Sequence, residues 1–329
     1  ANWESINRSE VNDGVNIAIE SMHITAIAQT VDSTLLAGTY GDGVYRSEDG
    51  GKNWRRANSG TGGTEFINQI DVISKTIILM ATNDKGLLES NNDALQWVKY
   101  EAGADSLKDS SINCFEYTSQ GAVVGSREHG IWFYEPLPTT DWVASDKEYF
   151  GITDITELGD GTLLAYDLES GLMKSTNKGR NWEPLSLPIV ENKSFLTSAA
   201  NDYIINVNDK MYISSDVGTT WSELTSYEGG MVNHLIYSQG KLLALKDHKV
   251  LYSTNKGTTW SSFSFGGPLD YIDNIAIAPN GDMYMTFMYN FYSTTDGDSL
   301  RNEVYKSTDN GASWVKIRTL DGFTKKGSQ

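Results

Sequence analysis

A string that ends in Trp recurs along the chain, and this recurrence constrains the fold more than any other feature. Ser47–Trp54, Ser214–Trp221 and Ser307–Trp314 carry the full string Ser-x-Asp-x-Gly-x-x-Trp. Ser175–Trp182 and Ser253–Trp260 keep the string with Asn in place of Asp. Self-similarity with a period of roughly 40 residues is the signature of a repeat architecture. The length of 329 residues therefore indicates repeats of one unit rather than two unrelated domains.

Tryptophan spacing extends the repeat over almost the whole chain. The copy at Ser90–Trp97 is degenerate, with Asn92 and Ala94, and the unit that ends at Trp142 has lost the string. Even so, seven tryptophans lie roughly 40 to 55 residues apart. We therefore expect seven units, which end near Trp54, Trp97, Trp142, Trp182, Trp221, Trp260 and Trp314.

Each unit contains four short β-rich runs, here termed strands A to D. In the first unit we expect A near Ile24–Gln29, B near Thr34–Tyr40, C near Val44–Glu48 and D from about Asn53. Short runs that are separated by regular turn signals are typical of an antiparallel meander. Four such strands per unit form the blade of a propeller. The sequence thus predicts an all-β chain that folds over residues 1–329 as a single seven-bladed β-propeller of four-stranded antiparallel blades.

Residues 1–20 precede the first unit. Trp3–Ile6 has the pattern of a D strand such as Trp182–Leu185, although all seven units already have one. We expect this segment to pair with the last blade and help to close the ring, or to be left from an upstream module. The chain starts at Ala1 without a basic and then apolar leader, so we expect that any signal peptide has been removed or never existed.

The repeated string resembles the Asp box of the bacterial neuraminidase repeat (BNR) propellers, and the resemblance covers almost the whole chain. Asp or Asn accepts backbone N–H bonds in a tight turn, Gly supplies positive φ, and Trp buries a large apolar face. We therefore expect a structural role for the box residues. These are Asp49, Asn177, Asp216, Asn255 and Asp309. The resemblance also implies that ligands bind on the face opposite the boxes.

The sequence motifs do not favour a sialidase. Sialidases that carry this repeat have six blades, three substrate-binding arginines and an Arg-Ile-Pro-type motif, and this chain has no such motif. Of its arginines, only Arg8, Arg127 and Arg301 fall where they can reach the face opposite the boxes. Xyloglucan-cleaving hydrolases with similar repeats place their cleft between two propellers, whereas this chain predicts one.

Composition excludes several further classes. There are 26 Lys+Arg and 43 Asp+Glu, a formal charge of -17, which argues against nucleic acid as a partner and against docking on an anionic membrane. The one cysteine, Cys114, rules out an intrachain disulfide and any zinc site with two thiolates, and its pattern predicts a buried strand residue. No apolar run has the roughly 18 residues of a membrane span. We expect no cofactor.

The face opposite the boxes collects the B–C loops and the D–A connections, because turns alternate between the two faces of a meander. Variable loops on a rigid scaffold commonly bind ligands. A long B–C loop, expected from Phe287 to Asn302, carries three aromatic residues. His234 and His248 belong to one blade, so they either form a transition-metal site or are solvated loop residues. The candidate ligand-binding residues are Arg127, His129, His248, Tyr289, Phe291 and Tyr292.

Carboxylates also gather on these loops. Asp42, Glu128, Asp167 and Glu169 are candidates for the acid and base of a glycosidase, or for a cation-binding or solubilising surface. We expect a non-catalytic recognition propeller that binds a glycan or a protein, and keep a glycoside hydrolase as the alternative. We further expect a monomer that is secreted, periplasmic or displayed on a bacterial cell surface.

Overall fold

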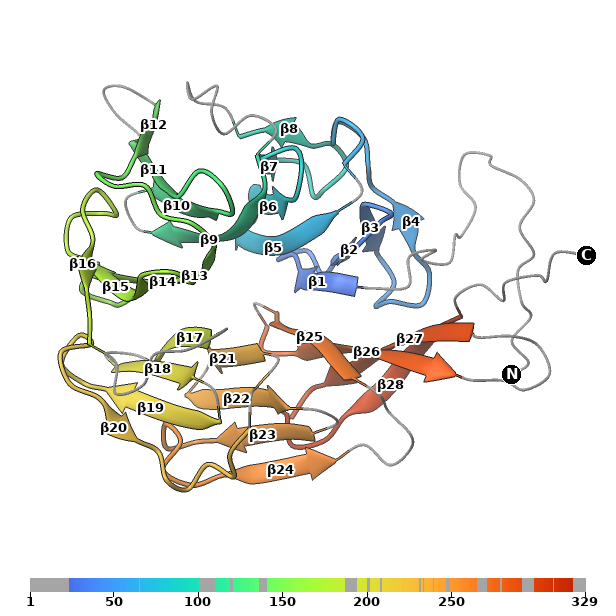
Figure 1. The fold of residues 1–329 in the computed structure, drawn as a ribbon. Helices are drawn as coiled ribbons and strands as arrows, with labels where there is room; N and C mark the ends of the chain where they lie inside the picture. Colours follow the sequence, from blue (N-terminus) through green and yellow to red (C-terminus); the bar gives the residue numbers. More distant parts are fainter. Residues whose placement is uncertain are drawn as a thin grey trace, which may run out of the picture.

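The computed structural model forms seven four-stranded antiparallel sheets arranged in a ring (Figure 1). It describes residues 24–64, 66–100, 110–118, 121–135, 141–186, 194–199, 202–207, 209–230, 232, 234–238, 240–246, 249–264, 271–278, 280–291, 299–309 and 311–321. The first strand of each blade contacts the first strand of the next, and the first strand of blade 7 contacts that of blade 1. The predicted seven-bladed propeller is thereby confirmed.

The strand bounds of blades 1 to 4 follow chain order. Blade 1 comprises β1 (Ile24–Gln29), β2 (Leu35–Thr39), β3 (Val44–Ser47) and β4 (Arg55–Arg56). Blade 2 comprises β5 (Ile67–Ser74), β6 (Ile77–Thr82), β7 (Leu87–Ser90) and β8 (Val98–Lys99). Blade 3 comprises β9 (Ile112–Thr118), β10 (Gly121–Ser126), β11 (Ile131–Glu135) and β12 (Asp141–Ala144). Blade 4 comprises β13 (Ile152–Glu157), β14 (Leu163–Asp167), β15 (Gly171–Ser175) and β16 (Glu183–Pro184).

Blades 5 to 7 repeat the same order. Blade 5 comprises β17 (Ser194–Ala199), β18 (Asp202–Val207), β19 (Lys210–Ser214) and β20 (Ser222–Glu223). Blade 6 comprises β21 (His234–Ser238), β22 (Lys241–Lys246), β23 (Lys249–Ser253) and β24 (Ser261–Ser264). Blade 7 comprises β25 (Tyr271–Ile277), β26 (Met283–Phe291), β27 (Ser299–Ser307) and β28 (Val315–Asp321). Within the described residues there is no helix that is long and apolar enough to cross a membrane.

Apolar cores lie between neighbouring blades, and the closing seam is built in the same way. Ile24 and Trp54 of blade 1 share a buried cluster with Tyr284 and Val304 of blade 7. Gln29 Nε2 of blade 1 also donates a hydrogen bond to the Tyr284 hydroxyl, at 3.1 Å. All four strands of blade 7 come from residues 271–321. The N-terminal segment 1–20, with Trp3, lies outside the described residues.

The repeated string forms the turn between the third and fourth strands. In blade 1 Asn53 N donates to Asp49 Oδ1 at 2.8 Å, and Gly51 N donates to Ser47 Oγ at 2.9 Å. Trp54 Nε1 closes the turn on Gly51 O at 3.0 Å. The equivalent Asp or Asn accepts a backbone N–H four residues later in the boxes of Asn177, Asp216, Asn255 and Asp309. Short outer strands such as β4 follow directly.

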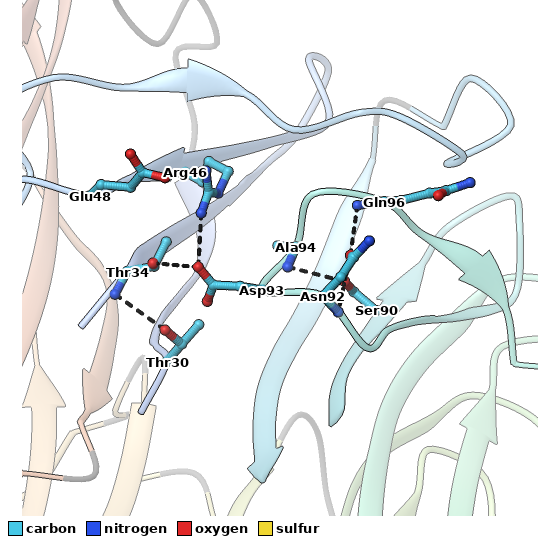
Figure 2. A network of polar contacts seen from close by, with 9 residues as sticks. All are labelled: Thr30, Thr34, Arg46, Glu48, Ser90, Asn92, Asp93, Ala94 and Gln96. Atoms are coloured by element: carbon cyan, nitrogen blue, oxygen red, sulfur yellow. Dashed lines mark hydrogen bonds and ion pairs between the residues drawn. The ribbon is translucent and has the colours of Figure 1, made fainter. Parts of the chain in front are cut away.

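The degenerate box of blade 2 keeps the turn bonds that Ser90 and Asn92 accept (Figure 2). Its Trp97 Nε1 instead donates to Ala57 O of blade 1, at 2.9 Å. Ala94 N donates to Ser90 Oγ at 3.0 Å, as the glycine does in the other boxes. Asp93 reaches across to blade 1, where Arg46 Nη2 and Thr34 Oγ1 both donate to its Oδ2 atom. Here the box joins two blades as well as closing a turn.

Blade 7 departs from the prediction of a long loop. The segment expected as a loop from Phe287 to Asn302 is mostly strand, because β26 and β27 are both nine residues long. Tyr289 pairs with Arg301 and Phe291 pairs with Ser299. Part of the long interval between tryptophans is therefore taken up by longer strands. We term residues 288–291 and 299–302 the arm of blade 7. Tyr292 lies outside the described residues.

Candidate ligand-binding face and channel wall

In blades 1 to 4 the connections between second and third strands emerge on one face, here termed the mouth face. It is defined by residues 40–43, 83–86, 127–130 and 168–170, together with Phe150, whose N–H binds Asp167. Each of these turns closes on the last residue of the second strand. Asp42 N donates to Thr39 Oγ1 at 3.1 Å, Lys85 N to Thr82 Oγ1 at 2.9 Å, and His129 N to Ser126 Oγ at 3.1 Å. In blade 4 the same position is occupied by Asp167.

Asp167 is the most buried of the candidate carboxylates. Its side chain has no exposed surface and accepts the backbone N–H groups of Phe150, at 2.9 Å, and of Glu169 and Ser170. These bonds tie the turn of blade 4 to the segment that enters β13. Glu169, the other candidate in this turn, is exposed. The two residues are close in sequence, but the Asp167 carboxyl is buried and the Glu169 carboxyl lies in solvent.

Asp42 is held by a cation. Arg56 Nη2 donates to Asp42 Oδ1 at 2.6 Å, and the Tyr45 hydroxyl donates to Asp42 Oδ2. The Asp42 side chain is 17% exposed, so its two oxygens are largely committed to these partners. In blade 3, by contrast, Arg127, Glu128 and His129 are exposed in one turn.

The predicted histidine pair is only partly described. His234 starts β21, where it is half-buried and pairs with Leu245, whereas His248 lies outside the described residues. Within the part of the chain that the structure describes, no group of three or more His, Cys, Asp or Glu side chains is arranged to hold a metal ion. Cys114 lies on β9 and is 6% exposed, which confirms the predicted buried cysteine.

Exposed apolar side chains lie on the mouth face. Tyr40 is 55% exposed and stands edge-on to Phe66, with 4.7 Å between the ring centroids. In blade 4 Phe150 is 46% and Leu168 is 57% exposed. Exposed aromatic and aliphatic side chains are the usual anchors of protein–protein contacts. These residues were not predicted as candidates from the sequence. Tyr40 and Leu168 each directly follow the second strand of a blade, and this position could have identified them.

The first strands line the centre of the ring, and each has one edge without a strand partner. Such an edge carries unpaired backbone groups. Side chains of the preceding blade bind them here. Phe115 N donates to Gln69 Oε1 at 3.0 Å, and Leu196 N donates to Asp154 Oδ2 at 2.9 Å. Further seam bonds run from the side chains of Asn68 to Ile112 O, Asn113 to Ile152 O, Thr25 to Ile67 O and Asn274 to Thr25 O.

Three half-buried carboxyl groups occupy this channel wall in consecutive blades. Burial raises the pKa of Asp71 to about 6 and the pKa of Asp154 to about 7. Burial and the carboxylates of Asp71, Asp154 and Glu157 raise the pKa of Glu116 to about 8. Functional acids were expected on loops, and these three strand residues were not predicted. Asp71 and Glu116 occupy the same position of β5 and β9, each directly after a buried residue, Ile70 or Phe115, whereas Asp154 lies two positions earlier in β13.

Part of the chain is similar to a known family of receptors. Residues 209–323 match the family model described as sortilin, neurotensin receptor 3. The matched region covers β19 and β20 of blade 5, blade 6, and blade 7 with its arm. The human VPS10 domain-containing receptor SorCS2 is 27% identical over 97 residues, which are 27% of this chain and 8% of the receptor. The chain thus spans a small part of that curated relative.

Solved structures show the same fold at low identity. The extracellular domain of the putative one component system BT4673 from B. thetaiotaomicron aligns with a TM-score of 0.64 and 14% identity, over 93% of this chain and 47% of that one. YCF48 from Cyanidioschyzon merolae aligns with a TM-score of 0.62 and 11% identity, over 87% of this chain and 97% of that one. At this identity the likeness concerns the propeller alone.

Proposed function

We propose that this chain is a non-catalytic, receptor-type propeller that binds a protein ligand on its mouth face, with the arm of blade 7 as part of the contact. The observation that carries the proposal is the long hairpin of β26 and β27, because it falls inside the region that matches the sortilin family model. The matches to a receptor and to an extracellular domain are consistent with a secreted or extracellular location. We infer a monomer exported by a bacterium.

Exposed side chains on the mouth face support a protein ligand. Tyr40, Phe150 and Leu168 offer apolar anchors beside polar loop residues such as Arg127 and His129. A central apolar contact with a polar rim is the usual anatomy of a protein interface. A glycan site would instead use aromatic platforms and neutral hydrogen-bonding groups in a shallow pocket.

The candidate carboxylates favour binding over hydrolysis. A glycosidase needs two carboxyl groups that face each other across the substrate, about 5 to 10 Å apart. Asp42 is engaged by Arg56 and Tyr45, and Asp167 by three backbone N–H groups. Each oxygen of both carboxyl groups thus already accepts a structural hydrogen bond.

A displayed random-peptide library, a glycan array and a polysaccharide hydrolysis screen test the proposal on the same protein. We expect peptides to be enriched, and Tyr40→Ala and Leu168→Ser to weaken their binding about tenfold. Val315→Ser is the matched control, since Val315 is an exposed apolar residue on the outer strand β28. Glycan binding without peptide binding would show that the ligand is a glycan and not a protein. Turnover that Asp167→Asn or Glu169→Gln abolishes would establish the hydrolase instead.

A further inference from the structure

Two carboxyl groups of the channel wall act as acceptors between blades. Glu116 on β9 accepts the backbone N–H of Glu157 on β13, at 3.3 Å. Asp154 on β13 accepts the backbone N–H of Leu196 on β17, at 2.9 Å. These bonds hold blade 3 to blade 4 and blade 4 to blade 5 along edges that are not paired with another strand.

Among the described residues, the charged groups that raise the pKa of Glu116 are acids. They are Asp71 on β5 and Asp154 and Glu157 on β13. The Cys114 thiol on β9 is influenced by Asp154 and Glu116, and the Tyr203 phenol on β18 by Asp160, Glu157 and Glu116. Ionisation of one carboxyl therefore places a negative charge among groups that are negative or acidic. Like charges at close range in a partly desolvated site are mutually destabilising.

We propose that Glu116 and Asp154 form a pH-sensitive latch in the inner ring, which is closed when both carboxyl groups are neutral and loosens between blades 3 and 5 when they ionise. A neutral carboxyl keeps its acceptor oxygen for the backbone N–H and avoids the repulsion. An ionised carboxyl accepts a stronger hydrogen bond, but burial and the neighbouring acids outweigh that gain, as the raised pKa values indicate.

The sign of the pH effect follows from linkage. A carboxyl whose pKa is higher in the folded than in the unfolded chain binds its proton more tightly in the folded state. Folding stability then falls as the pH rises from the ordinary carboxyl pKa to the raised folded value, and levels off above it. Exposed carboxyl groups are already ionised over most of this window, so the latch should dominate the change between about pH 6 and about pH 9.

Thermal unfolding across this pH range tests the latch in the full chain. We expect the melting temperature of the unmodified protein to fall by about 5 °C from about pH 6 to about pH 9. Glu116→Gln and Asp154→Asn keep a neutral acceptor, and each should remove a large part of that fall. Glu183→Gln, at an exposed carboxyl on the outer strand β16, is the matched control and should retain it. Variant curves that run parallel to the unmodified curve would overturn the proposal.

Hydrogen exchange of the unmodified protein gives a readout that does not depend on the variants folding. After correction for intrinsic rates, the amides of Glu157 and Leu196 should lose protection between about pH 6 and about pH 9 by roughly tenfold. Amides of β22 and β23, in blade 6, should keep theirs. Equal protection of the Glu157 and Leu196 amides at both pH values would contradict the latch.

Discussion

Asp93 of blade 2 binds Arg46 of blade 1, with Arg46 Nη2 2.8 Å from Asp93 Oδ2 (Figure 2). The Arg46 side chain is 9% exposed and that of Asp93 is 30% exposed, and the Thr34 hydroxyl donates to the same oxygen at 2.7 Å. The guanidinium also binds Glu48, which is largely in solvent. This box thus makes an inter-blade ion pair through Asp93, which occupies a variable position of the string.

Removal of this pair should destabilise the protein. In Asp93→Ala, Arg46 loses the less exposed of its two carboxylate partners, and the Thr34 hydroxyl loses its acceptor. We therefore expect the free energy of unfolding to fall by about 2 kcal/mol. Chemical denaturation measures this. Asp32→Ala, which removes the exposed Lys75–Asp32 pair, is the control and should cost under about 0.5 kcal/mol. Equal losses would show that the Arg46 pair contributes no more than a surface pair.

Gly60 and Gly63 offer a matched pair for steric fit. Both have positive φ, at 81° and 84°, so an alanine is strained at either position. A Cβ at Gly60 would lie 1.9 Å from the Trp97 carbonyl oxygen, whereas nothing lies within 4 Å of a Cβ at Gly63. We expect Gly63→Ala to cost about 1 kcal/mol and Gly60→Ala at least about 3 kcal/mol, measured by urea unfolding. Similar costs would mean that the loop moves freely away from Trp97.

Lys178 occupies a box position that glycine fills in blade 1. Its φ is 67°, and the equivalent Gly50 has a φ of 73°. The Lys178 side chain is exposed, so Lys178→Gly removes backbone strain without loss of packing. We expect a gain of about 1 kcal/mol, read as a melting temperature about 2 °C higher. Lys52→Gly, at an exposed box residue without positive φ, is the control and should lower the melting temperature.

Asp167 should matter for stability rather than for turnover. Asp167→Ala leaves three backbone N–H groups of the turn without their acceptor, and we expect a loss of about 3 kcal/mol. Glu169→Ala, at the exposed neighbour, should change stability by less than about 0.5 kcal/mol. Differential scanning calorimetry of the two variants separates them. A stable Asp167→Ala protein would argue that the carboxyl serves another purpose than closing the turn.

The repeat predicted the architecture well because the string fixes the same turn in every blade except blade 3. The first strand expected near Ile24–Gln29 is β1 at those residues, and blade 3 forms although Trp142 lacks the string. The aromatic segment around Tyr289 was wrongly expected as a loop, since interval length does not distinguish a long loop from a long hairpin. Channel acids such as Glu116 were missed because a carboxyl in a strand reads as solvent-facing until the ring closes around it.

The side-chain bonds of the channel wall have a consequence for how the ring is assembled. Asn274 of blade 7 donates to Thr25 O of blade 1, just as Asn68 of blade 2 donates to Ile112 O of blade 3. The junction between the last and the first blade is therefore made with the same kind of contact as a junction between blades 2 and 3. The ring is therefore held together by contacts that do not depend on where the chain begins. A circularly permuted chain that begins at another blade junction should form the same propeller.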